Sequence, residues 1–200
     1  MTPELLLAFA GYAFATSITP GPNNVMLLAS GANFGLDRSL PHMAGINLGF
    51  GAMVLAIGLG AEALFAAFPA LDIVLRLAGG GYLLWLAWRI ANAAPPETAG
   101  RSAPRPLSFL GAAAFQWVNP KAWLMAMGAV TAYLPATAEG WPWLAVLVAL
   151  FMLVNAPCLA VWTVAGTAVS RLLGRSIRFR IFNLAMALLL CLSLLPMVLE

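Results

Sequence analysis

Charged side chains are scarce in this chain. Only 8% of its 200 residues are Asp, Glu, Lys or Arg, whereas 62% are hydrophobic, and the mean hydropathy is +0.92. A soluble domain carries about 25% charged residues, so this composition excludes one or two soluble domains. The net charge of +3 is small and dispersed, which gives no support to nucleic-acid binding. The composition therefore predicts an integral membrane protein with several spans.

Cysteine and histidine are also rare, and this limits the chemistry available. Cys158 and Cys191 lie in apolar stretches and form no CxxC pair, so we expect them to be packing residues rather than a redox centre. His42 is the single histidine, and we expect it to be capped or solvated at the start of a span. These absences predict no metal, no cofactor and no enzymatic activity. They disfavour an intramembrane redox carrier, which stays the weakest alternative.

Long apolar stretches fill most of the chain. Six of them reach the roughly 20 residues needed to cross a bilayer, at about 4–33, 41–66, 70–91, 107–133, 141–168 and 178–199. The N-terminus lacks a basic region and carries Glu4, so we expect the first stretch to be a retained span and not a cleaved signal peptide. The prediction is an all-α membrane protein with six transmembrane helices in one domain, residues 1–200.

The basic residues predict the orientation of these spans. Eight of the ten Lys and Arg residues fall in the three odd-numbered connections: Arg38, Arg89, Arg101, Arg105, Arg171, Arg175, Arg178 and Arg180. Positive loops stay in the cytoplasm, so both termini are predicted on the periplasmic, outer side of a bacterial inner membrane. The segment 93–106, rich in Pro and Ala, is predicted to be a cytoplasmic linker.

Two of the six stretches contain helix-breaking residues at comparable depth. The first carries Thr19-Pro20-Gly21-Pro22-Asn23-Asn24, and the fourth carries Asn119-Pro120-Lys121. Proline removes a backbone donor and clashes with the preceding turn. A helix break inside a membrane is tolerated only where other parts of the protein bury it or where it lines a polar cavity. Matching breaks predict two inverted repeats of three helices, about 1–92 and 107–200, with broken helices one and four facing a shared transport site.

The candidate substrate-binding residues are those at the breaks and the embedded asparagines. A helix that restarts after a break offers free N–H groups to an anion such as a carboxylate, and a carboxamide can both donate and accept. Lys121 is too deep to reach water, so it either binds a substrate carboxylate, changes protonation, or bonds the loosened carbonyls of the break. For the asparagines the structural alternative is hydrogen bonding between helices. The set is Pro20, Gly21, Pro22, Asn23, Asn24, Asn47, Asn119, Pro120, Lys121 and Asn155.

No Asp or Glu lies near the middle of any predicted span. If transport is coupled to protons, then Asp37, His42, Lys121 or a less obvious route would have to carry them. The small residues Ser30, Gly31, Gly35, Gly45 and Gly49 are interpreted as close helix-packing positions, with hinges as the alternative. Such faces are also compatible with a homodimer.

Several of these segments together resemble the LysE/RhtB family of amino-acid exporters. They are Thr19 to Asn23, the spaced glycines Gly31 to Gly49, Gly81 to Arg89, and Asn119 to Ala122, in the family's order and within residues 14–125. The chain departs from the family's pattern at Ser39 and Ala87. The resemblance implies a secondary transporter in the inner membrane that exports amino acids or close derivatives by proton antiport, with alternating access. A membrane assembly subunit without transport remains the main alternative.

Overall fold

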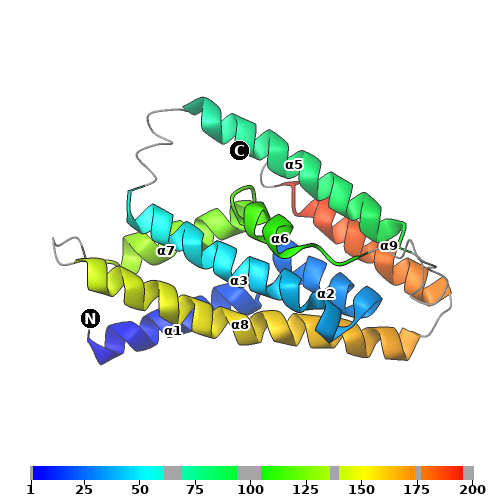
Figure 1. Cartoon of the computed structure of the whole chain (residues 1–200), viewed down its shortest axis with the longest axis horizontal. Coiled ribbons are helices and arrows are strands. Elements are labelled where there is room, and N and C mark those ends of the chain that lie inside the picture. The colour runs from blue at the N-terminus through cyan, green and yellow to red at the C-terminus, as the bar shows by residue number, and fades with distance from the viewer. Residues whose placement is uncertain (1, 61–68, 94–104, 136–139, 174–176, 196–200) are drawn as a thin grey trace.

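The computed structural model describes residues 2–60, 69–93, 105–135, 140–173 and 177–195, and the regular structure in these ranges is helical (Figure 1). Its helices run roughly along one long axis. They are α1 (Pro3–Ile18), α2 (Pro22–Phe34), α3 (Leu36–Gly58), α5 (Pro69–Ala91), α6 (Phe109–Gln116), α7 (Pro120–Tyr133), α8 (Gly140–Leu173) and α9 (Ile177–Leu192).

The first predicted span is broken where its prolines stand. Helix α1 ends at Ile18, Thr19 adopts an extended conformation, and Gly21 is fully extended with φ −177°. Pro22 then occupies the first position of α2, where the missing N–H would have had no helical partner anyway. The same chemistry breaks the fourth predicted span between α6 and α7, with Asn119 extended and Pro120 starting α7. The two predicted interruptions are therefore present.

Helix α3 begins earlier than we expected. It starts at Leu36 instead of residue 41, and Pro41 lies inside it. Gly35 has φ +80°, a conformation that glycine adopts without strain, so the chain reverses there and the new helix starts at the next residue. The second and sixth predicted spans extend into residues 61–66 and 196–199, and most of the linker 93–106 falls in residues 94–104. These parts lie outside the described ranges.

Each broken helix packs against an unbroken helix from the other half of the chain. Helix α2 lies along α8, where a side chain on Gly31 would collide with the Thr163 backbone and one on Gly166 with the Leu28 carbonyl. Helix α3 packs against α6, with Gly45 against the Phe109 carbonyl and Gly49 against Ala113. Gly31, Gly45 and Gly49 thus serve the close packing that the sequence predicted, while Gly35 forms the turn.

Three helices in the described ranges are long and apolar enough to cross a membrane: Leu36–Gly58, Ile73–Ala91 and Pro142–Leu172. The helices on either side of each break are not in this set because each of them is too short to cross a membrane alone.

Helices α5 and α9 pack on one another beside this assembly (Figure 1). The C-terminal ends of α5 and α8 and the N-terminal ends of α3 and α9 gather at one end of the molecule, and arginines occur at all four. We call this the arginine-bearing end.

Candidate functional site

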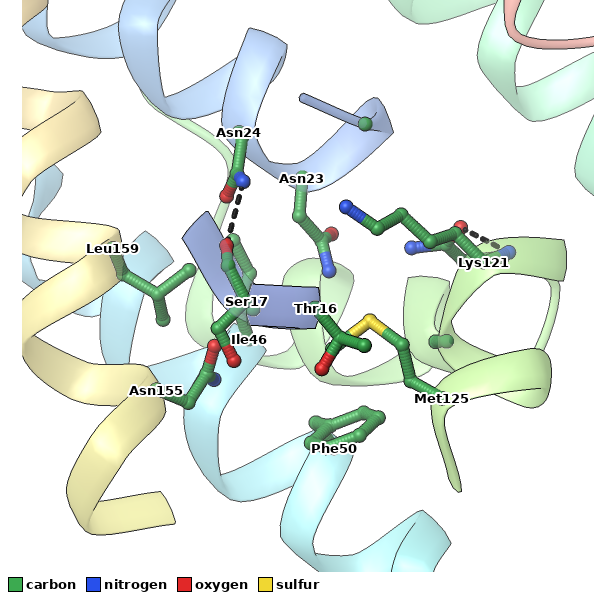
Figure 2. Close-up of a pocket in the computed structure, with 13 residues that line it drawn as sticks. Thr16, Ser17, Asn23, Asn24, Ile46, Phe50, Lys121, Met125, Asn155 and Leu159 are labelled. Atoms are coloured by element: carbon green, nitrogen blue, oxygen red, sulfur yellow. Dashed lines mark hydrogen bonds between the residues drawn. The ribbon is translucent and has the colours of Figure 1, made fainter. Parts of the chain in front are cut away.

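A central cavity lies where the two breaks meet (Figure 2). About 350 Å³ of empty space, counted out to its open mouth, separates the side chains of α1, α2, α3, α7 and α8. Its lining is mixed polar and apolar: Thr16, Ser17, Gly21, Asn23, Asn24, Ile46, Phe50, Asn119, Lys121, Ala122, Met125, Asn155 and Leu159. Six of the ten predicted binding residues are in this set, so the structure brings most of them together.

The start of α2 presents open backbone donors to this cavity. Its N-cap residue, Gly21, makes no side-chain capping bond, and the first-turn N–H groups of a helix have no partner within it. Gly21, Asn23 and Asn24 all line the cavity. The positive end of the helix dipole is also here. This arrangement suits an anionic group.

Lys121 connects the second break to the first. Its Nζ donates to the Thr19 carbonyl at 2.6 Å, the Thr19 hydroxyl at 3.0 Å and the Pro20 carbonyl at 3.2 Å. A side chain on Gly21 would meet the aliphatic part of Lys121, with its Cβ 2.5 Å from Cδ. Lys121 therefore hydrogen-bonds backbone carbonyls that a break has freed, which is one of the alternatives proposed above. These carbonyls belong to the first broken helix, however, and not to the helix that carries Lys121.

Asn119 caps the helix that it precedes. Its Oδ1 accepts a hydrogen bond from the Lys121 backbone N–H at 3.2 Å, and the residue is 1% exposed. The start of α7 is thus already partly satisfied, in contrast to the start of α2. Pro20, Pro22 and Pro120 shape the two breaks without lining the cavity themselves.

Asn23 pairs with a residue that sequence reasoning missed. Its Nδ2 donates to Gln116 Oε1 at 2.8 Å, and Gln116 Nε2 donates back to Asn23 Oδ1 at 3.2 Å. Gln116 is fully buried at the end of α6 and also donates to the Ala112 carbonyl. A glutamine in an apolar span, one turn before a proline break, is costly unless it is paired. Its position in the sequence could therefore have indicated a hydrogen-bonded residue near the break.

The other asparagines hold helices and breaks together. Asn24 Nδ2 donates to the Ser17 and Thr19 carbonyls, both at 2.8 Å, and so satisfies the frayed end of α1. Asn155 on α8 donates to Asn47 on α3 at 2.9 Å. Asn155 also lines the cavity, whereas Asn47 is not in its lining.

Two of the proposed coupling residues lie outside the central cavity. Asp37 is exposed in the first turn of α3. His42 is only 2% exposed, and neither ring nitrogen has a hydrogen-bond partner. Our expectation of a capped or solvated histidine is therefore wrong. The earlier start of α3 places His42 well inside the helix, beside a cavity that residues of α2 and α5 also line. Among the described residues no three His, Cys, Asp or Glu side chains are placed to hold a metal ion.

Comparison with known proteins places the chain among transporters. Residues 14–194 match the family model described as LysE type translocator. The chain is 34% identical over 193 residues to the "Cysteine/O-acetylserine efflux protein" of Escherichia coli strain K12 and to that of Shigella sonnei strain Ss046, and 33% identical to that of Escherichia coli O157:H7. Each alignment covers 95% of this chain and 95% of the relative. No solved structure matches the chain significantly.

Proposed function

The chain belongs to the LysE type translocator family, and we propose that it exports small amino acids or their close derivatives across the bacterial inner membrane. Cysteine and O-acetylserine are the compounds that appear in the names of its relatives, so they are the first substrates to test. Membership of this family favours a transporter over the assembly subunit and the redox carrier. One observation carries the binding mode: Lys121 of one broken helix reaches the open break of the other.

In this proposal the substrate carboxylate binds between the Lys121 ammonium and the uncapped start of α2. The ammonium now rests on backbone carbonyls of Thr19 and Pro20. A carboxylate is a stronger partner for it because both groups are charged, and the N–H groups at the start of α2 can hold the same anion. Arriving substrate would thus draw Lys121 away from the carbonyls. The Asn23–Gln116 pair and Asn155 remain to hydrogen-bond the rest of the molecule.

Six spans in two inverted repeats fit the packing. The broken helices α1–α2 and α6–α7 would each cross the membrane as one interrupted span. Helices α3, α5, α8 and α9 would be the other four spans. In the repeat alignment α3 corresponds to α8, and α5 to α9. The contacts respect this exchange, because α1 and α2 both pack on α8, and their counterparts α6 and α7 both pack on α3. The corresponding pairs α3–α8 and α5–α9 also touch each other. The Asn47–Asn155 bond joins such corresponding helices.

Alternating access would open one of two apolar barriers at a time. Toward the N-terminal end of α1, the cavity is bordered by Phe50, which packs in an aromatic group with Phe9, Tyr12, Tyr133 and Phe151. On the opposite side it is bordered by Ile46 and Leu159, which cluster with Leu27 and Ala112. Both apolar clusters are packed in this structure. Protons are the proposed counter-ion, and Lys121 is the candidate carrier at the cavity.

The test is export from cells. A strain that overexpresses the protein should release more O-acetylserine or cysteine into the medium and tolerate higher concentrations of both than a strain with the empty vector. Lys121→Ala should abolish the gain, whereas Thr131→Ala, on the exposed face of the same helix, should keep it. Equal extracellular amino acids with and without the protein, over a panel of neutral amino acids, would contradict the proposal.

A further inference from the structure

A second cavity lies between α2, α3, α5 and the segment 105–107, near the arginine-bearing end. Its lining borders about 490 Å³ of empty space, a volume that includes open solvent at its mouth. Its polar lining residues are Ser30, Asn33, His42, Arg89 and Arg105. It shares no lining residue with the central cavity. The transport proposal above does not use it.

His42 indicates that this cavity binds a polar molecule. The residue is 2% exposed and lines the cavity, yet both ring nitrogens lack a hydrogen-bond partner. Buried side-chain polar atoms are nearly always hydrogen-bonded, either to protein or to an ordered water molecule. A neutral imidazole offers one donor and one acceptor. A bound molecule that both donates and accepts would satisfy both nitrogens.

The charge of the lining selects an anionic group. Arg89 donates through Nη2 to the Arg105 carbonyl at 3.1 Å, and its guanidinium stacks on Trp85 at 4.8 Å. These contacts fix the guanidinium but use only part of its five N–H donors. Arg105 supplies a second guanidinium, and no acidic side chain is among the described residues that line the cavity. Arginine pairs with carboxylates through two parallel hydrogen bonds.

Ser30 supplies an acceptor for a positive group. The Ser39 hydroxyl donates to the Gly35 carbonyl at 2.8 Å, and the two serine oxygens are 2.7 Å apart. Since a hydroxyl has one proton, Ser30 must be the donor in the serine pair. Its oxygen keeps a free lone pair. Together with the acceptor nitrogen of His42, this oxygen suits an ammonium group beside the arginine-bound carboxylate.

One apolar cluster stands between the two cavities. Ile46 and Leu159 line the central cavity, and Leu107 of the second cavity packs against the same cluster. His42, Ile46 and Phe50 follow one another at four-residue spacing, which puts them on one face of α3. Along α2, Asn23 and Ser30 are seven residues apart, or about 10 Å. The cavities are thus consecutive along the same two helices.

We propose that the second cavity is an entry site that binds the zwitterionic substrate at the arginine-bearing end before the apolar cluster opens to the central cavity. The inference rests on the proposed function, from which it takes the substrate class. It assigns the carboxylate to Arg89 and Arg105, and the ammonium to Ser30 and His42.

The test counts bound substrate. Purified protein in lipid nanodiscs is equilibrated with radiolabelled O-acetyl-L-serine, and the number bound per chain at saturation is measured. Wild type should bind two molecules. Arg105→Gln, an exposed position that should not disturb folding, should bind one, and so should His42→Phe. His42→Gln, which again offers a donor and an acceptor, should regain the second molecule. Lys121→Met should lose the central molecule and keep the other.

The outcomes separate the two proposals. O-acetylserine methyl ester, which lacks the carboxylate, should displace neither bound molecule. One molecule per chain in wild type, lost with Lys121→Met and unaffected at Arg105 and His42, would overturn the entry site and leave the proposed function intact. No binding of any neutral amino acid tested would contradict both. Far-UV circular dichroism and size-exclusion chromatography show that each variant is folded.

Discussion

At the scale of single residues, the site depends on a lysine that crosses from one broken helix to the other. Lys121 is embedded in an apolar helix, where an unpaired charge costs about 2.5–3.5 kcal/mol on insertion scales. Its three contacts to Thr19 and Pro20 offset that cost without neutralising the charge. The ammonium is therefore held in place and remains available to a carboxylate.

Gly21→Ala should impair transport while sparing the fold. The new Cβ would lie 2.5 Å from Lys121 Cδ, so the flexible lysine must move, whereas the extended backbone at Gly21 accepts alanine without strain. Loss of one charge-assisted hydrogen bond, about 1.5–3 kcal/mol, corresponds to roughly a tenfold or greater loss of transport rate. Export and thermal melting of the purified protein measure the two effects. Gly11→Ala, where nothing lies within 4 Å, is the control and should change neither.

Asn23 and Gln116 should show a split between stability and transport. Asn23→Leu leaves the buried Gln116 amide without its partner, which should cost about 1–3 kcal/mol of stability. The double variant with Gln116→Leu removes both polar groups and should recover much of the melting temperature. Transport should stay low in both variants if the pair binds substrate. Recovery of transport together with stability would assign the pair a purely structural role.

At the scale of helices, close backbone contact holds the broken segments against their partners. The glycines of α2 and α3 let α8 and α6 approach so closely that a methyl group would strike main-chain atoms. Within a membrane, such packing replaces the hydrophobic effect as the main attraction between helices. The same contacts set the position of both breaks, and hence of the site.

Gly31→Ala should destabilise the whole protein. Its Cβ would collide with the Thr163 carbonyl, a backbone atom that cannot rotate away. Overpacking of this kind costs about 1–3 kcal/mol, and sometimes more. We expect a lower melting temperature and a lower yield of folded protein. The matched control is Gly81→Ala on α5, with open space around the position, and an equal effect of the two substitutions would contradict the packing described.

Element by element, the breaks were predictable and their partners were not. Proline fixes its own φ and lacks an N–H wherever it stands, so the interruptions at Pro20–Pro22 and Pro120 follow from local chemistry. The Lys121–Thr19 bond joins residues 102 positions apart, and it exists only because two helices pack together. The burial of His42 likewise depends on the packing of helices around α3. Gln116 was overlooked although its polarity within an apolar span was visible.

At the scale of the whole molecule, the arginines predict how the protein sits in the membrane. The arginine-bearing end should face the cytoplasm. Alkaline phosphatase fused after residue 200 should therefore be active, and green fluorescent protein inserted at residue 100, within the predicted linker, should fluoresce. The control exchanges the two reporters between these sites. Alkaline phosphatase at residue 100 should be inactive, and green fluorescent protein after residue 200 should not fluoresce. Activity in the exchanged pair would reverse the orientation, and with it the direction of the entry site.

Substrate counterflow in proteoliposomes tests directly whether Lys121 binds the substrate. Purified wild type and Lys121→Met, which keeps most of the side chain's length and removes its charge, are reconstituted with unlabelled O-acetylserine inside and labelled O-acetylserine outside. Wild type should accumulate label rapidly and Lys121→Met only at background level, although both proteins melt at similar temperatures. Undiminished counterflow by Lys121→Met would contradict the claim that Lys121 and the open start of α2 bind the substrate carboxylate.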